Sequence, residues 1–125
     1  MKTHELKLDI KYFNDVKSGK KKFEIRKNDR DFRLRDNLKL IACRNGNYVR
    51  WNKNKKKWVH TTKRKADKFN VKILNVMHGI PQASKWTNSY QEIYIKTINK
   101  VLNDYFSTDR LPDGYVILGI EGAAR

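Results

Sequence analysis

The chain has 125 residues, a length that favours one domain built around one hydrophobic core. It carries 29 Lys and Arg against 13 Asp and Glu, a formal net charge of +16 at neutral pH. Cys43 is the only cysteine, which excludes an intramolecular disulfide and a cysteine metal cluster and fits a cytoplasmic protein. The polar amino terminus and the absence of a long apolar run argue against a signal peptide and a membrane span.

The excess positive charge lies in one contiguous segment. From Lys17 to Lys72 there are 21 basic and 5 acidic residues, a net of +16, and the rest of the chain has 8 of each. Such a concentration is expected of a protein that binds a polyanion, and the alternative is a basic surface that only keeps the protein soluble. We therefore expect contact with a nucleic acid or another polyanion.

The first expected elements are a strand and a short helix. Apolar residues alternate from Leu6 to Ile10, which predicts a strand that ends near Asp9. Asp9 is expected to cap a helix that runs to about Ser18 and packs its apolar face on the core. Gly19 suits the position just after that helix.

The stretch that follows contains the pattern G-x-K-x-x-E-x-R, formed by Gly19, Lys21, Glu24 and Arg26. Phe23 and Ile25 alternate with Glu24 and Arg26, which predicts a strand over 22–27 with one apolar and one charged face. The charged face is either an ion pair that stabilises the fold or a polar functional site.

A turn is expected at 28–31, with Phe32 and Leu34 packed beneath it. Strands are expected over 38–42, 48–51 and 57–62. The strand over 38–42 is expected to be buried on both faces near its end.

The strand over 48–51 is expected to follow an Asn-Gly turn at 44–47. A second turn is expected at 52–56. Two tryptophans, Trp51 and Trp58, flank this lysine-rich second turn. Lysines can contact phosphates and indole rings can stack on bases, whereas the alternative is a solvated hairpin held by cross-strand packing.

The last expected elements are a strand over 69–77, a helix over about 90–106 and a closing strand over 115–121. No metal or cofactor is expected, because His4, His60 and His78 lie at no ligand spacing and no Walker or dinucleotide-binding loop occurs. We interpret His4 as a structural or solvated residue.

Three segments together resemble a known family. They are His4 to Lys7 (HELK), Phe23 to Phe32 (FEIRKNDRDF) and Gly114 to Glu121 (GYVILGIE). In this order they resemble the small bacterial and phage subfamily DUF3850, within the ASCH family of the PUA-like superfamily. In that subfamily a Gly-Asp pair usually starts the strand after the second segment, and here Arg35 and Asp36 stand there.

The middle of the chain, roughly Cys43 to Asp113, resembles the family less and is longer than is usual there. We therefore interpret residues 1–125 as a single ASCH/PUA-like domain with a basic hairpin insertion at about 44–68 and an inserted helix at about 88–106.

The resemblance implies an α+β fold, namely a PUA-like, partly open β-barrel of about six strands with an N-terminal helix and a helix in the C-terminal half. It also implies a ligand cleft between the N-terminal helix and the barrel, lined by the G-x-K-x-x-E-x-R residues. Members of the superfamily commonly bind RNA. Some ASCH proteins are enzymes, including ribonucleases and an amidohydrolase that acts on acylated cytidine.

The first functional hypothesis is a nucleic-acid-binding module without a cofactor, with RNA favoured over DNA. Its candidate contacts are basic, polar and aromatic groups of the cleft and of the hairpin. They are Lys21, Lys22, Arg26, Lys27, Asn28, Arg30, Arg50, Trp51, Lys53, Lys55, Lys56, Lys57, Trp58, Lys63 and Arg64. Phosphate contacts would dominate the affinity, so binding should weaken steeply with salt.

The second hypothesis is a hydrolase in which Lys21, Glu24 and Arg26 are catalytic. The resemblance implies it, because a lysine at the position of Lys21 acts in the ASCH amidohydrolases. Crowding by Lys20, Lys22 and Arg26 would lower the pKa of Lys21, whereas Glu24 favours its charged form. Those enzymes also use a separate glutamate, and no glutamate of this chain after Glu24 lies in a matching motif.

The third hypothesis is a phage protein that inhibits a host factor, such as a nucleic-acid enzyme. The small, basic chain fits this origin, but no partner can be identified from the sequence. An exposed apolar face on the helix over 90–106 would favour it.

Overall fold

The structure is a computed structural model that describes residues 1–78 and 111–122. Within these residues the elements follow the order β1 (Thr3–Asp9), α1 (Ile10–Lys17), β2 (Phe23–Lys27), β3 (Asn37–Arg44), β4 (Asn47–Asn52), β5 (Lys57–His60), β6 (Lys68–Met77) and β7 (Tyr115–Gly122). The helix expected over 90–106 lies outside the described residues.

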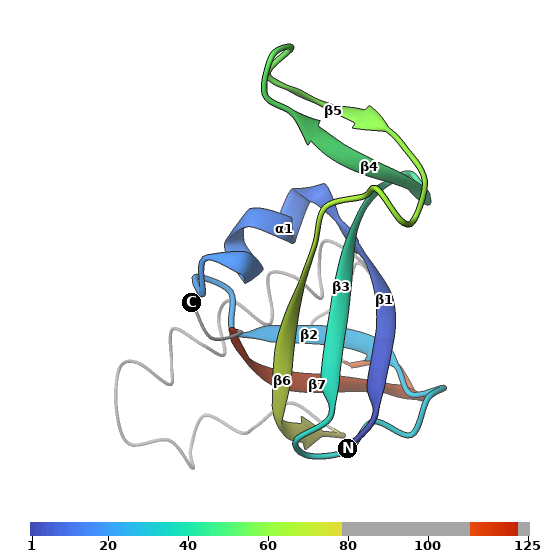
Figure 1. Cartoon of the computed structure of the whole chain (residues 1–125). Coiled ribbons are helices and arrows are strands. Elements are labelled where there is room, and N and C mark those ends of the chain that lie inside the picture. Colours follow the sequence, from blue (N-terminus) through green and yellow to red (C-terminus); the bar gives the residue numbers. More distant parts are fainter. Residues whose placement is uncertain (79–110, 123–125) are drawn as a thin grey trace.

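The strands form one seven-stranded, mostly antiparallel sheet that is not closed into a barrel. Its order is β2-β7-β6-β3-β4-β5, and β1 pairs in parallel with β3. β2 and β7 cross β1 and β3 steeply, and α1 lies beside the sheet (Figure 1). The arrangement is compatible with the predicted α+β class.

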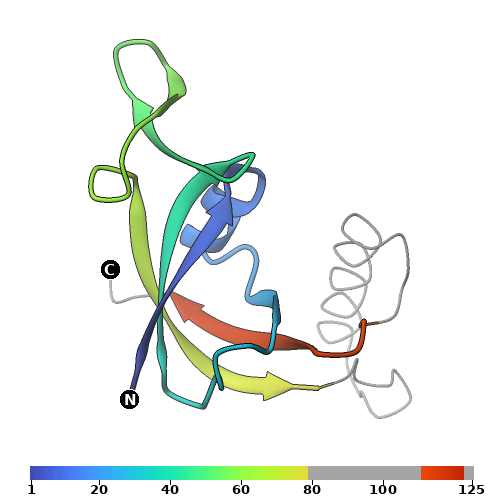
Figure 2. The ribbon, with the colours of Figure 1, turned by 90° about the vertical axis from the view of Figure 1, so that its right-hand side faces the viewer.

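The β4–β5 hairpin projects away from the rest of the sheet in both views (Figures 1 and 2). Its entry is the predicted Asn-Gly turn, in which Asn45 has a φ of 52° and Gly46 a φ of 80°. Two successive left-handed residues give the turn geometry that suits a two-residue hairpin. Arg44 then pairs with Asn47 across this turn, as expected.

The centre of the core is β3. Leu38 and Leu40 are fully buried, and the run from Leu40 to Cys43 is buried on both faces, as the sequence predicts. β1 covers one edge of β3 from Asn37 to Cys43, and β6 covers the other edge from Asn37 to Ile41. Both edges of β3 are therefore paired with other strands, and its side chains from Leu40 to Cys43 are protected from water.

The predicted helix cap is confirmed. The Asp9 carboxylate accepts a hydrogen bond of 2.9 Å from the backbone N–H of Lys11. Phe13 and Val16 are buried against the sheet, so the short helix is held by packing as well as by its cap. Gly19 follows the helix with a φ of 85°, which suits the expected position after its C-terminus.

The loop between β2 and β3 departs from expectation at one residue. Phe32 is buried, but Leu34 is 61% exposed, so the expectation that both pack beneath the turn was wrong for Leu34. Leu34 lies at a turn whose next residue, Arg35, has a φ of 70°. The left-handed backbone of Arg35 lies at the position where the resemblance implies a glycine.

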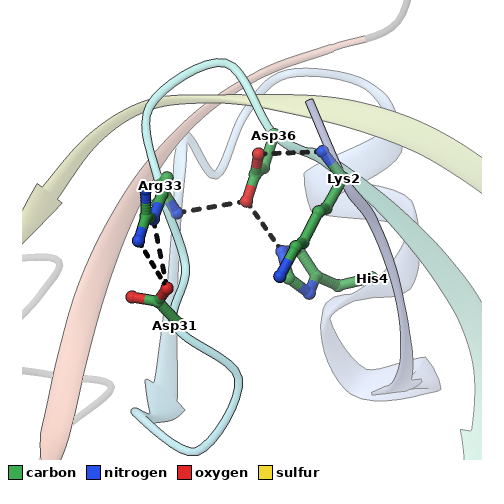
Figure 3. Close-up of polar contacts among 5 residues, drawn as sticks. All are labelled: Lys2, His4, Asp31, Arg33 and Asp36. Atoms are coloured by element: carbon green, nitrogen blue, oxygen red, sulfur yellow. Dashed lines mark hydrogen bonds and ion pairs between the residues drawn. The ribbon is translucent and has the colours of Figure 1, made fainter.

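Asp36 joins this loop to the start of β1 (Figure 3). Its carboxylate accepts hydrogen bonds from the backbone N–H of Lys2 at 3.0 Å, from His4 Nε2 at 2.8 Å and from the backbone N–H of Arg33 at 3.2 Å. His4 is buried and its ring meets Phe32 edge to face, with 4.9 Å between ring centroids. These contacts agree with the structural interpretation of His4.

The surroundings of Asp36 change its acidity. Burial by itself would raise the pKa of Asp36, but hydrogen bonds from His4 and from the two backbone N–H groups outweigh it. The pKa of Asp36 is therefore held below its usual range. Because the folded pKa is lower than the unfolded value of about 4, ionised Asp36 stabilises the fold above that pH. This stabilisation is lost as the pH falls through the folded pKa.

We predict that Asp36→Asn lowers the free energy of unfolding at pH 7 by about 1–3 kcal/mol, because a charged acceptor of three hydrogen bonds is lost. The variant should also lose less stability than the native chain between about pH 4 and pH 2. Urea unfolding followed by tryptophan fluorescence at several pH values measures both effects.

The matched control is Asp31→Asn. Asp31 pairs with Arg33 at the surface, where its side chain is 67% exposed, and exposed ion pairs contribute little. Parallel pH profiles for the native chain and Asp36→Asn would contradict the assigned role of Asp36.

Candidate nucleic-acid interface

The G-x-K-x-x-E-x-R residues form a buried ionic cluster. Lys21 is 7% exposed and Glu24 is 4% exposed. Lys21 Nζ donates to Glu24 Oε1 at 2.9 Å and to the backbone carbonyl of Phe23 at 2.8 Å. Arg26 Nε donates to Glu24 Oε2 at 3.2 Å. One carboxylate thus accepts from two cations that come from the entrance and the middle of β2.

Aromatic rings surround the buried lysine. Lys21 Nζ lies 5.0 Å from the ring centroid of Tyr12 on α1 and 4.5 Å from that of Phe23 on β2. The ring faces attract the ammonium, and Glu24 balances its charge. Lys21 therefore joins α1 to β2, and its ammonium is already bound by a carboxylate and a carbonyl.

Two arginines bridge the opening between the edge strands β1 and β2. Arg26 Nη2 donates to the backbone carbonyl of Lys7, and Arg30 Nη1 donates to the backbone carbonyl of Glu5 at 2.6 Å. Both carbonyls lie on β1, whose one strand partner in the described part of the chain is β3. Side chains thus satisfy backbone groups that a neighbouring strand would otherwise satisfy.

A polar hollow of about 590 Å³ lies beside this bridge. Its basic lining consists of Lys7, Arg26, Arg30 and Lys63. Tyr48 also lines it, and Lys7 Nζ lies 5.0 Å from the Tyr48 ring centroid. We call this feature the basic hollow.

The basic hollow differs from the cleft that the family resemblance implies. Of the G-x-K-x-x-E-x-R residues, Arg26 lines it, and no residue of α1 does so. Glu5 also lines it and reaches Lys63 at 3.5 Å. The lining of the hollow therefore has an excess of positive charge, part of which Glu5 compensates.

The β4–β5 hairpin carries an uncompensated group of cations. All are exposed, and within residues 1–78 and 111–122 none forms an ion pair. They are Arg50, Lys53, Lys55, Lys56 and Lys57. Because the hairpin projects from the sheet (Figure 1), β4 and β5 lie away from β2, the strand that carries Glu24.

The two tryptophans of the hairpin have different environments. They are directly opposite in the β4–β5 register and meet edge to face at 5.6 Å. On its inner side Trp58 contacts Phe13, with 5.6 Å between ring centroids, and Phe13 contacts Phe69, with 4.9 Å between ring centroids. Trp58 is therefore an anchor that joins the hairpin to the core, whereas Trp51 is 43% exposed.

The structure brings some of the predicted contact residues together and separates others. Arg26, Arg30 and Lys63 meet at the basic hollow, and Lys21 is buried away from it. The remaining members outside the hairpin are exposed on the surface. They are Lys22, Lys27, Asn28 and Arg64.

Sequence reasoning missed two residues of the basic hollow, Lys7 and Tyr48. Lys7 could have been found from the alternation of β1, in which Leu6 and Leu8 are buried and Lys7 points away from them. Tyr48 is brought to Lys7 by the parallel pairing of β1 with β3 and the tight turn into β4, which the pattern alone does not reveal.

Other chemistry is limited in the described part of the chain. There, no group of three or more His, Cys, Asp or Glu residues is placed to hold a metal ion. Burial, together with the Asp9 carboxylate, raises the pKa of the Cys43 thiol, so the thiol is expected to be unreactive at neutral pH. Among the same residues, no helix has the length and apolar character needed to cross a membrane.

Within the described residues, these features are those of a small basic protein built on one sheet, with one short helix and two cationic surfaces. Residues 3–74, more than half of the chain, match the family model described as "Domain of unknown function (DUF3850)". The chain therefore belongs to this family. No curated protein matches it.

The matched residues include α1, the ionic cluster and the β4–β5 hairpin. The closing segment from Gly114 to Glu121 lies beyond them. That the hairpin and the helix at about 88–106 are insertions stays a prediction.

We predict that Glu24→Gln lowers the free energy of unfolding by about 3–5 kcal/mol, because it leaves the buried Lys21 ammonium without a countercharge. The double variant Lys21→Met with Glu24→Gln should recover part of this loss, since it removes the uncompensated charge. Denaturant unfolding of the native chain, both single variants and the double variant gives the coupling energy. Strictly additive losses would show that the two side chains do not interact as the geometry indicates.

Proposed function

We propose that this protein is a nucleic-acid-binding module of PUA-like architecture, with RNA favoured over DNA. The observation that best supports the proposal is the β4–β5 hairpin, whose exposed Arg50, Lys53, Lys55, Lys56 and Lys57 have no paired carboxylate among the described residues. The preference for RNA rests on the family resemblance.

The lysines of the hairpin suit a phosphate backbone. A lysine ammonium is a flexible point charge that accepts many phosphate geometries, so a cluster of lysines favours binding that depends little on sequence. Each phosphate contact releases condensed counterions, which makes the affinity fall with salt. The absence of paired carboxylates on the hairpin, within the described residues, means that little of this attraction is cancelled locally.

The basic hollow offers a second phosphate contact. A guanidinium has five N–H donors, and Arg26 uses its Nε and Nη2 while Arg30 uses Nη1 for the contacts on β1. Donors therefore remain on both arginines at the rim of the hollow. Planar guanidinium groups held by fixed carbonyls are suited to bidentate recognition of phosphate.

The hydrolase hypothesis has weaker support. An ammonium that donates to Glu24 and to the Phe23 carbonyl has no lone pair for attack on a substrate. We therefore favour binding over ribonuclease or amidohydrolase activity.

A cytoplasmic location, expected from the single cysteine, stays a prediction.

We predict that the full chain shifts labelled RNA in a gel, that the shift fades steeply between about 50 and 200 mM salt, and that the probe stays intact on a denaturing gel. Lys55→Glu with Lys56→Glu should weaken binding by about tenfold or more. The same variant should reduce the salt slope by about 2, because each lysine that no longer neutralises a phosphate lowers the slope by about one unit.

The matched control is Lys2→Glu with Lys72→Glu, which changes the net charge equally. These residues lie near the end of the sheet opposite the hairpin, where Thr3 and Lys72 neighbour Asn37. Equal weakening by both pairs would indicate a general charge effect and not a hairpin site. Failure to shift RNA or DNA at low salt would contradict the proposal and favour a protein partner. RNA cleavage that Lys21→Ala abolishes would favour the hydrolase.

A further inference from the structure

We propose that the groove between α1 and the β4–β5 hairpin holds an unpaired base of a single-stranded nucleic acid against Trp51. This inference rests on the proposed nucleic-acid-binding function and goes beyond it, because it assigns a stacking site and selects single strands over duplexes. It concerns a different surface from the basic hollow and from the ionic cluster.

Trp51 is an aromatic platform that is held by one backbone contact and one ring contact. Its backbone N–H donates to Asp67 Oδ2 at 3.0 Å, and its ring meets Trp58 edge to face at an interplanar angle of 72°. Trp58 is in turn fixed by Phe13 of α1. Because these contacts order the indole in advance, little conformational entropy is lost when a ligand binds to it.

The edge-to-face geometry leaves an indole face of Trp51 available. In a T-shaped pair the edge of one ring points at one face of the other. If the edge of Trp58 points at a face of Trp51, Trp58 leaves the opposite face of Trp51 open. If instead the edge of Trp51 points at Trp58, Trp58 leaves both faces of Trp51 open. The 43% exposure of Trp51 agrees with either arrangement.

Cations from both α1 and the hairpin line the groove together with this platform. The groove has a volume of about 420 Å³, and Lys17 of α1 and Lys53 of the hairpin line it together with Trp51. Lys17 and Lys53 are exposed, and neither donates a side-chain hydrogen bond within the described residues. By contrast, Lys68 donates to the backbone carbonyls of Lys63 and Arg64.

An aromatic ring and two lysines that line the same groove suit a nucleotide strand. The base stacks on the ring, and the phosphates on either side of that nucleotide reach the lysines. The one carboxylate that lines the groove among the described residues belongs to Asp67, which already accepts from the Trp51 N–H. The charge of the groove therefore favours a polyanion over an apolar protein segment.

Stacking of this kind selects single strands. In a duplex both faces of a base are covered by its neighbours, so a base that stacks on Trp51 must leave the helix or come from an unpaired strand. Phosphate contacts by lysine make no such distinction. Trp51 should therefore determine strand preference, and the lysines should determine overall affinity.

The decisive experiment compares Trp51→Leu, Trp51→Phe and the control Leu34→Ala, which truncates an exposed apolar residue on the loop before β3. The probes are labelled single-stranded RNA of about 12 nucleotides, within the site sizes of comparable single-strand binders, and the matching duplex. Circular dichroism checks that each variant is folded.

Trp51→Leu should weaken single-strand binding by about tenfold, the size expected for one base stacked on one aromatic ring. Duplex binding and the salt slope should not change, because no cation is removed. Trp51→Phe should lose less affinity, since it keeps an aromatic face, and Leu34→Ala should bind like the native chain.

Fluorescence supplies an independent readout. Saturation with the single strand should quench the native indole emission, and the part of the quenching that Trp51 contributes should disappear in Trp51→Phe. Unchanged single-strand affinity in Trp51→Leu, together with undiminished quenching in Trp51→Phe, would overturn the stacking site but leave the proposed function intact. Equal weakening of single strand and duplex would also overturn it. The absence of binding by the native chain to any probe would overturn both.

Discussion

The fold depends on how two edge strands of its sheet are joined. β1 and β2 do not pair, and two guanidinium groups bridge them by donating to carbonyls of β1. Glu24 fixes one of these guanidiniums through Arg26 Nε and binds the buried Lys21 through its other oxygen. Because the groups that bridge the two strands are cations, the surface beside this bridge is basic. The structural requirement and the charge of the hollow therefore have one cause.

Because the arginines of the basic hollow also stabilise the fold, variants of the hollow and variants of the hairpin test different things. Removing Arg26 would disturb this bridge as well as any phosphate contact, since its guanidinium holds both Glu24 and β1. The lysines of the hairpin have no such structural duty. Lys55 and Lys56 lie in the exposed turn and pair with no carboxylate in the parts of the chain that are described. A loss of binding at the hairpin would therefore report on function alone, which is why the hairpin supports the proposal best.

Local sequence signals predicted most of the secondary structure, whereas contacts between residues far apart in the chain were missed. The Asp9 cap and the Asn45–Gly46 turn depend on neighbours in the chain, so their chemistry is visible in the sequence, and the three motifs that resemble DUF3850 led to the correct family. The burial of Lys21 was not predictable, because it depends on Tyr12 of α1 and on the carboxylate of Glu24 meeting at the strand entrance. The contribution of Lys7 to the basic hollow required the parallel pairing of β1 with β3.

The two tryptophans show what packing adds to a sequence pattern. In the sequence they are equivalent, since each flanks the lysine-rich turn. In the structure they also pair directly across β4 and β5. Contact with Phe13 removes this equivalence, because it packs Trp58 against the core, whereas Trp51 stays 43% exposed. Under the proposed function the two parts of the hairpin would then act at different ranges. The lysines attract a polyanion through a field that extends about 10 Å at ordinary salt, whereas Trp51 acts only on a base in contact with it. Attraction by the lysines without stacking would retain any nucleic acid, and the addition of the indole face would retain single strands preferentially.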